Sequence, residues 1–108
     1  MIRNGGRYRV VFVTCGSVAE ARNIGRAVVE KKLAACANIV SGVESIYRWK
    51  GKVERAREVL VIIKTSATRL RELEREVKRL HSYDVPEFIA LPIVAGSKDY
   101  LEWIGENA

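Results

Sequence analysis

Cys15 and His81 have side chains suited to a soft or borderline metal ion. Thiolate sulfur and imidazole nitrogen are ligands that copper and zinc prefer in proteins. One such pair falls short of the four ligands of a closed structural zinc site, so water, a third protein ligand or a second subunit would have to complete it. The alternative interpretation is structural, with Cys15 a small strand-end residue and His81 a helix C-cap favoured by the helix dipole.

Catalytic chemistry has weaker support. The sequence contains no Ser–His–Asp order, phosphate loop or zinc-protease motif, and it has 1 histidine. Tyr83, Asp84 and Glu87 could exchange protons, but carboxylates beside a turn usually only face solvent. We therefore predict that the chain is not an enzyme and uses no organic cofactor.

The composition fits one domain over residues 1–108, with residues 1–6 as a loose N-terminal extension. The apolar fraction is 48%, and no apolar run approaches the roughly 20 residues of a membrane span. We expect a cytoplasmic protein with two reduced thiols and no membrane partner. The net charge is +6, but basic and acidic residues alternate along 69–79, which is typical of an ion-paired helix face and argues against a nucleic-acid partner. Glutamine is absent, which points weakly to a thermophilic source.

The first half of the chain predicts a strand, a helix and a long hairpin. Residues 7–14 are β-branched and aromatic, and Ser17 with Glu20 forms a capping box for a helix that reaches about Leu33. Residues 35–50 predict a long strand with a bulge or bend at Ser41-Gly42, and Lys50-Gly51 predicts a tight turn into a partner strand over 53–64. The apolar run 59–63 suggests a strand covered on both faces.

The second half predicts a helix, a strand and a terminal helix. Thr65, Ser66 or Thr68 would cap a helix with an apolar stripe, which consists of Leu70, Leu73, Val77 and Leu80. Residues 81–86 end that helix. Residues 87–95 predict a strand in which Pro92 marks a bulge or a sheet edge. Gly96 reads as a turn, and Ser97 caps a helix over 98–106.

This βαββαβ order with a C-terminal helix predicts an α+β, ferredoxin-like fold, an antiparallel sheet in strand order 4-1-3-2. One end of such a sheet would collect the end of the first strand, the hairpin turn and the start of the fourth strand. The residues expected there are Cys15, Trp49, Lys52, His81, Tyr83 and Glu87. Cys36 would lie at the other end, roughly 20 Å away, so Cys15 should meet His81 and not Cys36.

Two other ferredoxin-like classes fit poorly. An RNA-recognition motif needs stacking aromatic residues on its central strands, and the run Leu60–Ile63 has none. A copper-chaperone domain would carry a Cys-x-x-Cys motif after its first strand, where this chain has a single thiol.

Five blocks, in order from about residue 8 to 104, resemble CutA, the divalent-cation tolerance family. They are Lys32–Ile39, Ser45–Glu54, Ile63–Thr65, His81–Glu87 and Tyr100–Ile104. The resemblance implies a very stable, thermostable homotrimer in which the long hairpin takes part in pairing between subunits. It also implies a role in tolerance to copper and other divalent cations, with copper binding in some members.

The resemblance maps onto the metal-ligand candidates residue by residue. His81 matches the family's His-x-Tyr position, and Cys15 matches a strand-end position where some members have cysteine. Ser82 stands where the usual pattern has proline, which would free the backbone around His81. Trp49, near the hairpin tip, is a candidate interface anchor.

Two alternatives to metal binding stay open. A cleft between subunits, lined by Tyr47, Lys52, Tyr83 and Glu87, could bind a small effector, as in the PII-type signalling proteins. The trimer could also be a purely structural anchor for a partner protein.

Overall fold

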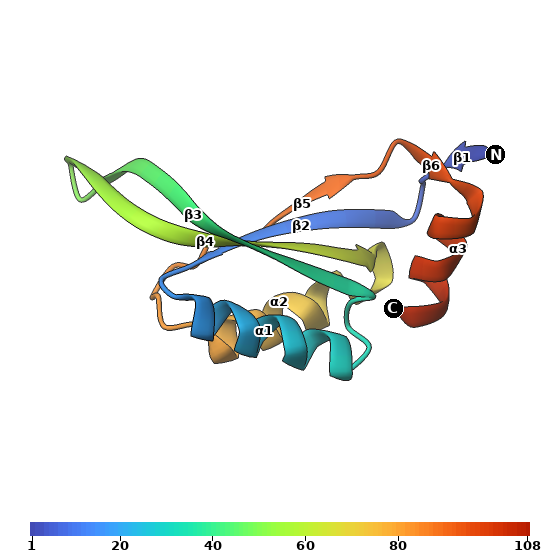
Figure 1. The fold of residues 1–108 in the computed structure, drawn as a ribbon, viewed down its shortest axis with the longest axis horizontal. Helices are drawn as coiled ribbons and strands as arrows, with labels where there is room; N and C mark the ends of the chain where they lie inside the picture. The colour runs from blue at the N-terminus through green and yellow to red at the C-terminus, as the bar shows by residue number, and fades with distance from the viewer.

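The computed structural model describes all of residues 1–108 and contains a four-stranded antiparallel sheet (Figure 1). Its order is β3-β4-β2-β5, which confirms the predicted strand order. The strands are β2 (Tyr8–Cys15), β3 (Cys36–Trp49), β4 (Lys52–Ser66) and β5 (Ile89–Pro92). Three helices, α1 (Val18–Glu30), α2 (Leu70–Leu80) and α3 (Lys98–Asn107), complete the mixed α+β fold. None of them is long and apolar enough to cross a membrane.

Helices α1 and α2 cover one face of the sheet, and the core lies between them and the strands (Figure 1). Alternate residues of β2 and β4 point into it, because side chains of a strand alternate between its two faces. The predicted stripe of α2 also packs there, with Leu73 and Val77 fully buried and Leu70 and Leu80 partly buried.

The opposite face of the sheet carries no helix. Leu60 and Ile62 on β4 alternate with the fully buried Val61 and Ile63, and they remain partly exposed on this open face. Phe12 of β2 lies opposite Ile62 and is partly exposed as well. The run 59–63 was expected to be covered on both faces. Within one chain, only the face beneath the helices is covered.

The ends of α1 and α2 differ in how they are capped. The Ser17 Oγ accepts a hydrogen bond from the Glu20 N–H at 3.1 Å, as predicted. Helix α1 ends at Glu30, before the predicted Leu33, because Lys32 takes a left-handed φ of 58°. The predicted side-chain cap of α2 was wrong. A short 3₁₀ turn, η1 (Ala67–Arg69), precedes α2, and the Thr65 hydroxyl donates instead to the Leu33 carbonyl at 2.7 Å.

The hairpin of β3 and β4 confirms the predicted turn and bulge. Lys50 and Gly51 both have positive φ, 49° and 78°, which suits a two-residue turn between twisted strands. The register shifts between Val40 and Val43, around Gly42 at φ 78°. Cys15 of β2 pairs with Val59, so β4 residues 52–58 run past the rest of the sheet, roughly 24 Å at about 3.4 Å per residue.

The short two-stranded sheet that the chain forms after β5 was not predicted. Strand β5 ends at Pro92, well short of residue 95, and the chain then forms β6 (Ala95–Ser97), which includes the Gly96 predicted as a turn. Strand β6 pairs with β1 (Ile2–Asn4), so the first six residues are not the loose extension expected from the sequence. The Ser97 Oγ caps α3, as predicted, by accepting from the Tyr100 N–H at 3.4 Å.

Candidate functional site

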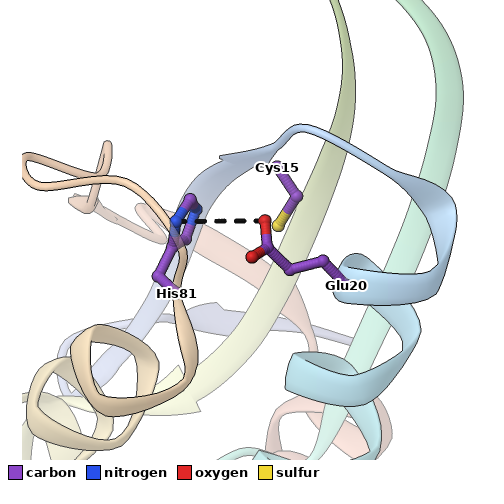
Figure 2. Close-up of side chains that lie close together, drawn as sticks. All are labelled: Cys15, Glu20 and His81. Atoms are coloured by element: carbon purple, nitrogen blue, oxygen red, sulfur yellow. Dashed lines mark ion pairs between the residues drawn. The ribbon is translucent and has the colours of Figure 1, made fainter.

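Three potential metal ligands meet where β2, α1 and α2 come together. Cys15 is the last residue of β2, Glu20 lies in the first turn of α1, and His81 is the C-cap of α2. One ligand atom from each lies within 4.8 Å of the other two, and the side chains point toward one another (Figure 2). The predicted proximity of Cys15 and His81 is confirmed. The prediction missed Glu20, whose position in a capping box gave no sign that it would lie beside these two side chains.

Two hydrogen bonds fix the ring of His81. The ring Nε2 lies 2.7 Å from the carbonyl oxygen of Thr14, and the Tyr83 N–H donates to Nδ1 at 3.1 Å. Because a carbonyl only accepts, Nε2 must carry the proton and Nδ1 the free lone pair, which describes a neutral imidazole. The Nδ1 lies 4.0 Å from the nearer carboxylate oxygen of Glu20. A histidine that donates one N–H to a backbone carbonyl has its other nitrogen oriented as a metal ligand would be.

The Glu20 carboxylate is held by two backbone donors. The Ser82 N–H donates at 2.9 Å and the Gly16 N–H at 3.4 Å. Burial alone would raise the pKa of Glu20, but the hydrogen bonds from Ser82, the positive charge that His81 carries when protonated and the Gly16 hydrogen bond outweigh it and lower the pKa. Proline at position 82 would have no N–H to give. The serine was expected to loosen this region, but its N–H ties the turn after α2 to α1.

Cys15 is a buried thiol. Burial raises its pKa to about 12, and the negative charges of Glu20 and Glu58 add to the effect. The other cysteine, Cys36, lies elsewhere: on β4 its partner Lys64 is five residues from Val59, the partner of Cys15, which is about 17 Å along the strand. Both thiols are free.

The donor set of Cys15, Glu20 and His81 suits zinc or copper with one position left for water. Metal bonds of about 2.0–2.3 Å would bring the ligand atoms to roughly 3.5 Å from one another, so the cluster would have to contract. The ion would also have to displace the thiol proton and the Tyr83 N–H at Nδ1. Both requirements lower affinity, and the release of the thiol proton makes it depend on pH.

Beside this cluster lies a cleft of about 670 Å³ between the projecting hairpin and the turn that follows α2. Four of the five residues expected to form a cleft or interface line it, namely Tyr47, Trp49, Tyr83 and Glu87. Lys52, the fifth, pairs with Trp49 at the hairpin tip and is not part of the lining. The sequence missed Glu58, which stands in the charged half of β4 and also lines the cleft.

Glu58 shapes the electrostatics of the cleft. The Tyr83 hydroxyl donates to it at 3.0 Å. Burial, this hydrogen bond and the charge of Glu58 raise the pKa of Tyr83 to about 12. Burial and the same charge raise the pKa of Glu87.

Comparison with known proteins places this fold and these residues in one family. Residues 9–107 match the family model described as "CutA1 divalent ion tolerance protein". The "Divalent-cation tolerance protein CutA" of Thermus thermophilus is 49% identical over 98 residues, covering 91% of this chain and 95% of that protein. The "Protein CutA, chloroplastic" of Arabidopsis thaliana is 50% identical over 95 residues, covering 88% of this chain and 52% of that protein. This chain thus spans about half the length of the plant relative.

Solved structures agree with the sequence comparison. The structure of the divalent cation tolerance protein CutA1 from Thermus thermophilus superimposes with a TM-score of 0.92 at 48% identity, covering 94% of this chain and 98% of that one. The CutA structure from Archaeoglobus fulgidus gives a TM-score of 0.89 at 41% identity, with coverage of 93% and 97%. The chain therefore belongs to the CutA1 divalent ion tolerance protein family.

Proposed function

We propose that this protein binds a divalent cation at Cys15, Glu20 and His81. The ion is copper or one with similar ligand preferences, and binding is weak and reversible. The observation that carries the proposal is the approach of three different ligand types to within 4.8 Å of one another. The names of the relatives, which speak of divalent-cation tolerance, agree with it. The thiol is protonated at neutral pH and would make a poor nucleophile, which favours binding over thiol catalysis at this cluster.

The cluster has features that favour reversible binding. The Thr14 carbonyl holds the His81 ring in the tautomer that presents Nδ1, and the Ser82 N–H holds Glu20 beside it. Without metal, the Tyr83 N–H occupies Nδ1, so no buried side-chain nitrogen or oxygen is left without a hydrogen bond. An ion replaces that contact and must also release the thiol proton. The gain over the metal-free state is therefore modest.

We also propose that the protein works as a homotrimer. Two features support self-association: the hairpin that extends past its own sheet, and an open sheet face with partly exposed Phe12, Leu60 and Ile62. The outer edges of β3 and β5 are unpaired within the chain, and such edges are usually covered in native proteins. Trp49 and Val53 expose apolar surface near the hairpin tip, where a neighbouring subunit would shield it.

The metal proposal is tested by titrating the oxygen-free, reduced protein with Cu²⁺ and Zn²⁺ against a chromophoric chelator at neutral pH. C15A and H81A should each weaken binding by about tenfold or more, since each removes one of three protein ligands. C36A is the matched control, because it removes a thiol at the other end of the sheet. It should leave affinity unchanged.

Equal affinity of the native protein, C15A and H81A would refute the site. Affinity lost in C36A alone would move the site to the other end of the sheet and would also refute it. Circular dichroism of each variant checks that the fold is intact. Removing bound metal with a chelator should restore the starting spectrum, because the nitrogen and oxygen ligand atoms are already hydrogen-bonded without metal.

A further inference from the structure

The cleft beside the hairpin has an acidic and aromatic lining in a protein that is basic overall. The net charge is +6, yet no lysine, arginine or histidine lines the cleft. Its acidic residues are Glu44, Glu58, Asp84 and Glu87. Only Glu44 has an ion-pair partner, Arg55 at 3.0 Å. Three carboxylates of the cleft thus have no cationic partner in the chain.

Glu58 is the residue that most favours binding of a cation in this cleft. The residue is 8% exposed, and its one protein hydrogen bond comes from the Tyr83 hydroxyl to Oε2. Glu58 belongs to the cleft lining, and none of its buried oxygen atoms lacks a hydrogen bond. A mostly buried carboxylate without a cationic partner would still gain from a counter-charge brought close to it. The nearest candidate position for that counter-charge is the cleft itself.

The aromatic lining indicates which kind of cation fits. Tyr47, Trp49 and Tyr83 are each between about a third and a half exposed and line the same space as the carboxylates. Aromatic faces attract organic ammonium groups and also pack against the carbon chain that carries them. The volume lies within the range of small-molecule sites.

The spacing of the acids argues against a bare metal ion in the cleft. The one group of three or more metal-ligating residues whose ligand atoms approach within 4.8 Å of one another is Cys15, Glu20 and His81. Glu58, Asp84 and Glu87 therefore do not converge on a single point. Carboxylates spread around an aromatic-lined space suit a ligand with several cationic groups separated by apolar links.

We propose that this cleft binds an aliphatic polyamine, with one ammonium group at Glu58, another toward Glu87 and Asp84, and the carbon chain against Tyr47 and Trp49. This site is separate from the proposed metal cluster. Ion pairing and desolvated contact with aromatic faces supply the affinity, and the spacing of the acids supplies the selectivity for more than one charge.

The test is a calorimetric titration of the native protein, in its solution assembly, with spermidine. E58Q and E87Q should each weaken binding, E58Q by about tenfold or more, because a charge-assisted hydrogen bond in a buried position is lost. E106Q is the matched control: it removes the same charge from an exposed position on α3, outside the cleft and without an ion pair. It should bind as the native protein does.

A neutral diol of the same length as spermidine should not bind, and C15A should bind spermidine normally, so this proposal and the metal proposal fail separately. Absence of saturable spermidine binding by the native protein would overturn the inference, as would occupation of the cleft by a second copy of the chain. Equal weakening in E58Q, E87Q and E106Q would reduce the effect to general charge and would overturn it too. E87Q keeps the test valid if E58Q does not fold, because Glu87 is exposed.

Discussion

The backbone N–H of Ser82 is a single donor that joins two helices through the Glu20 carboxylate. We predict that S82P raises the pKa of Glu20 toward its ordinary value, because proline cannot donate. S82A should lie between, since it keeps the backbone donor and loses the hydroxyl, which also lowers this pKa. The measurement is the pH titration of the Glu20 side-chain carboxyl carbon by NMR. The same pKa in S82P and the native protein would contradict the role given to this bond.

The buried thiol of Cys15 should make the stability of the protein depend on pH in the alkaline range. Its folded-state pKa of about 12 lies above the ordinary value of 9.0, mainly because of burial. A raised acid pKa means that the folded state favours the neutral thiol. Its contribution to stability is therefore complete below pH 9 and is lost as the pH rises from about 9 toward 12. The melting temperature of the native protein should fall more steeply over this window than that of C15A.

The comparison with C15A isolates the thiol from lysines and tyrosines that titrate in the same range. C36A, which keeps Cys15, should follow the native curve. Parallel curves for C15A and the native protein would show that the thiol ionises equally well in the folded and unfolded states. That result would also remove the main obstacle to metal binding at this cluster.

Between elements, α1 and α2 are linked by an ion-pair network around Glu76. The Glu76 carboxylate lies 2.7 Å from the Lys31 Nζ of the α1 C-cap and 2.7 Å from an Arg79 nitrogen on α2. Hydrogen bonds from Arg79 and Lys31 lower the pKa of Glu76 from 4.5 to about 2. The network therefore stabilises the fold above about pH 4.5, and its contribution disappears as the pH falls toward 2.

We predict that acid destabilises the native protein more than E76Q between pH 5 and 2. At neutral pH, E76Q should be the less stable of the two, and their stabilities should converge at the acid end. Urea unfolding at several pH values measures the difference. E74Q is the control, since Glu74 forms an exposed ion pair with Lys78 within α2 alone. A constant difference between E76Q and the native protein across this range would contradict the prediction.

The element order was predictable because each element carries its own local signal. The stripe of α2, the capping box of α1 and the Lys50-Gly51 turn act within a few residues, so they can be read along the chain. The pairing of β1 with β6 could not be read, because two strands of 3 residues from opposite ends of the chain carry no periodicity. Pro92 did signal an edge, and β5 lies at the edge of the sheet.

The candidate site was predictable only in part for a related reason. Topology brings Cys15 and His81 to one end of the sheet, because the strand order decides which strand ends and loops gather there. Glu20 and Glu58 were missed because each already had an ordinary explanation, a helix cap and a charged strand on a solvated hairpin. Their present roles depend on the Ser82 N–H and the Tyr83 hydroxyl, contacts that only the folded chain defines.

At the scale of the whole molecule, the hairpin makes the chain long for its size, 46 Å along its longest axis against 25 and 23 Å across. A two-stranded hairpin that projects from its sheet is only marginally stable by itself. Ordered strands out to Trp49 and Lys52 are explained if neighbouring subunits pack against them. The assembly would then stabilise both the hairpin and the cleft that it forms with the turn after α2.

We predict a mass near three times 12.1 kDa for the native protein by light scattering at micromolar concentration. V53E should lower the mass, because the side chain is 66% exposed in the single chain and a charge there would be buried against a neighbour. I2E is the matched control, since Ile2 is also exposed but lies on the short strand β1 at the other end of the molecule. It should keep the native mass, and circular dichroism should show that both variants are folded. A monomeric native protein would contradict the trimer, and a mass lowered equally by V53E and I2E would remove the hairpin from its interface.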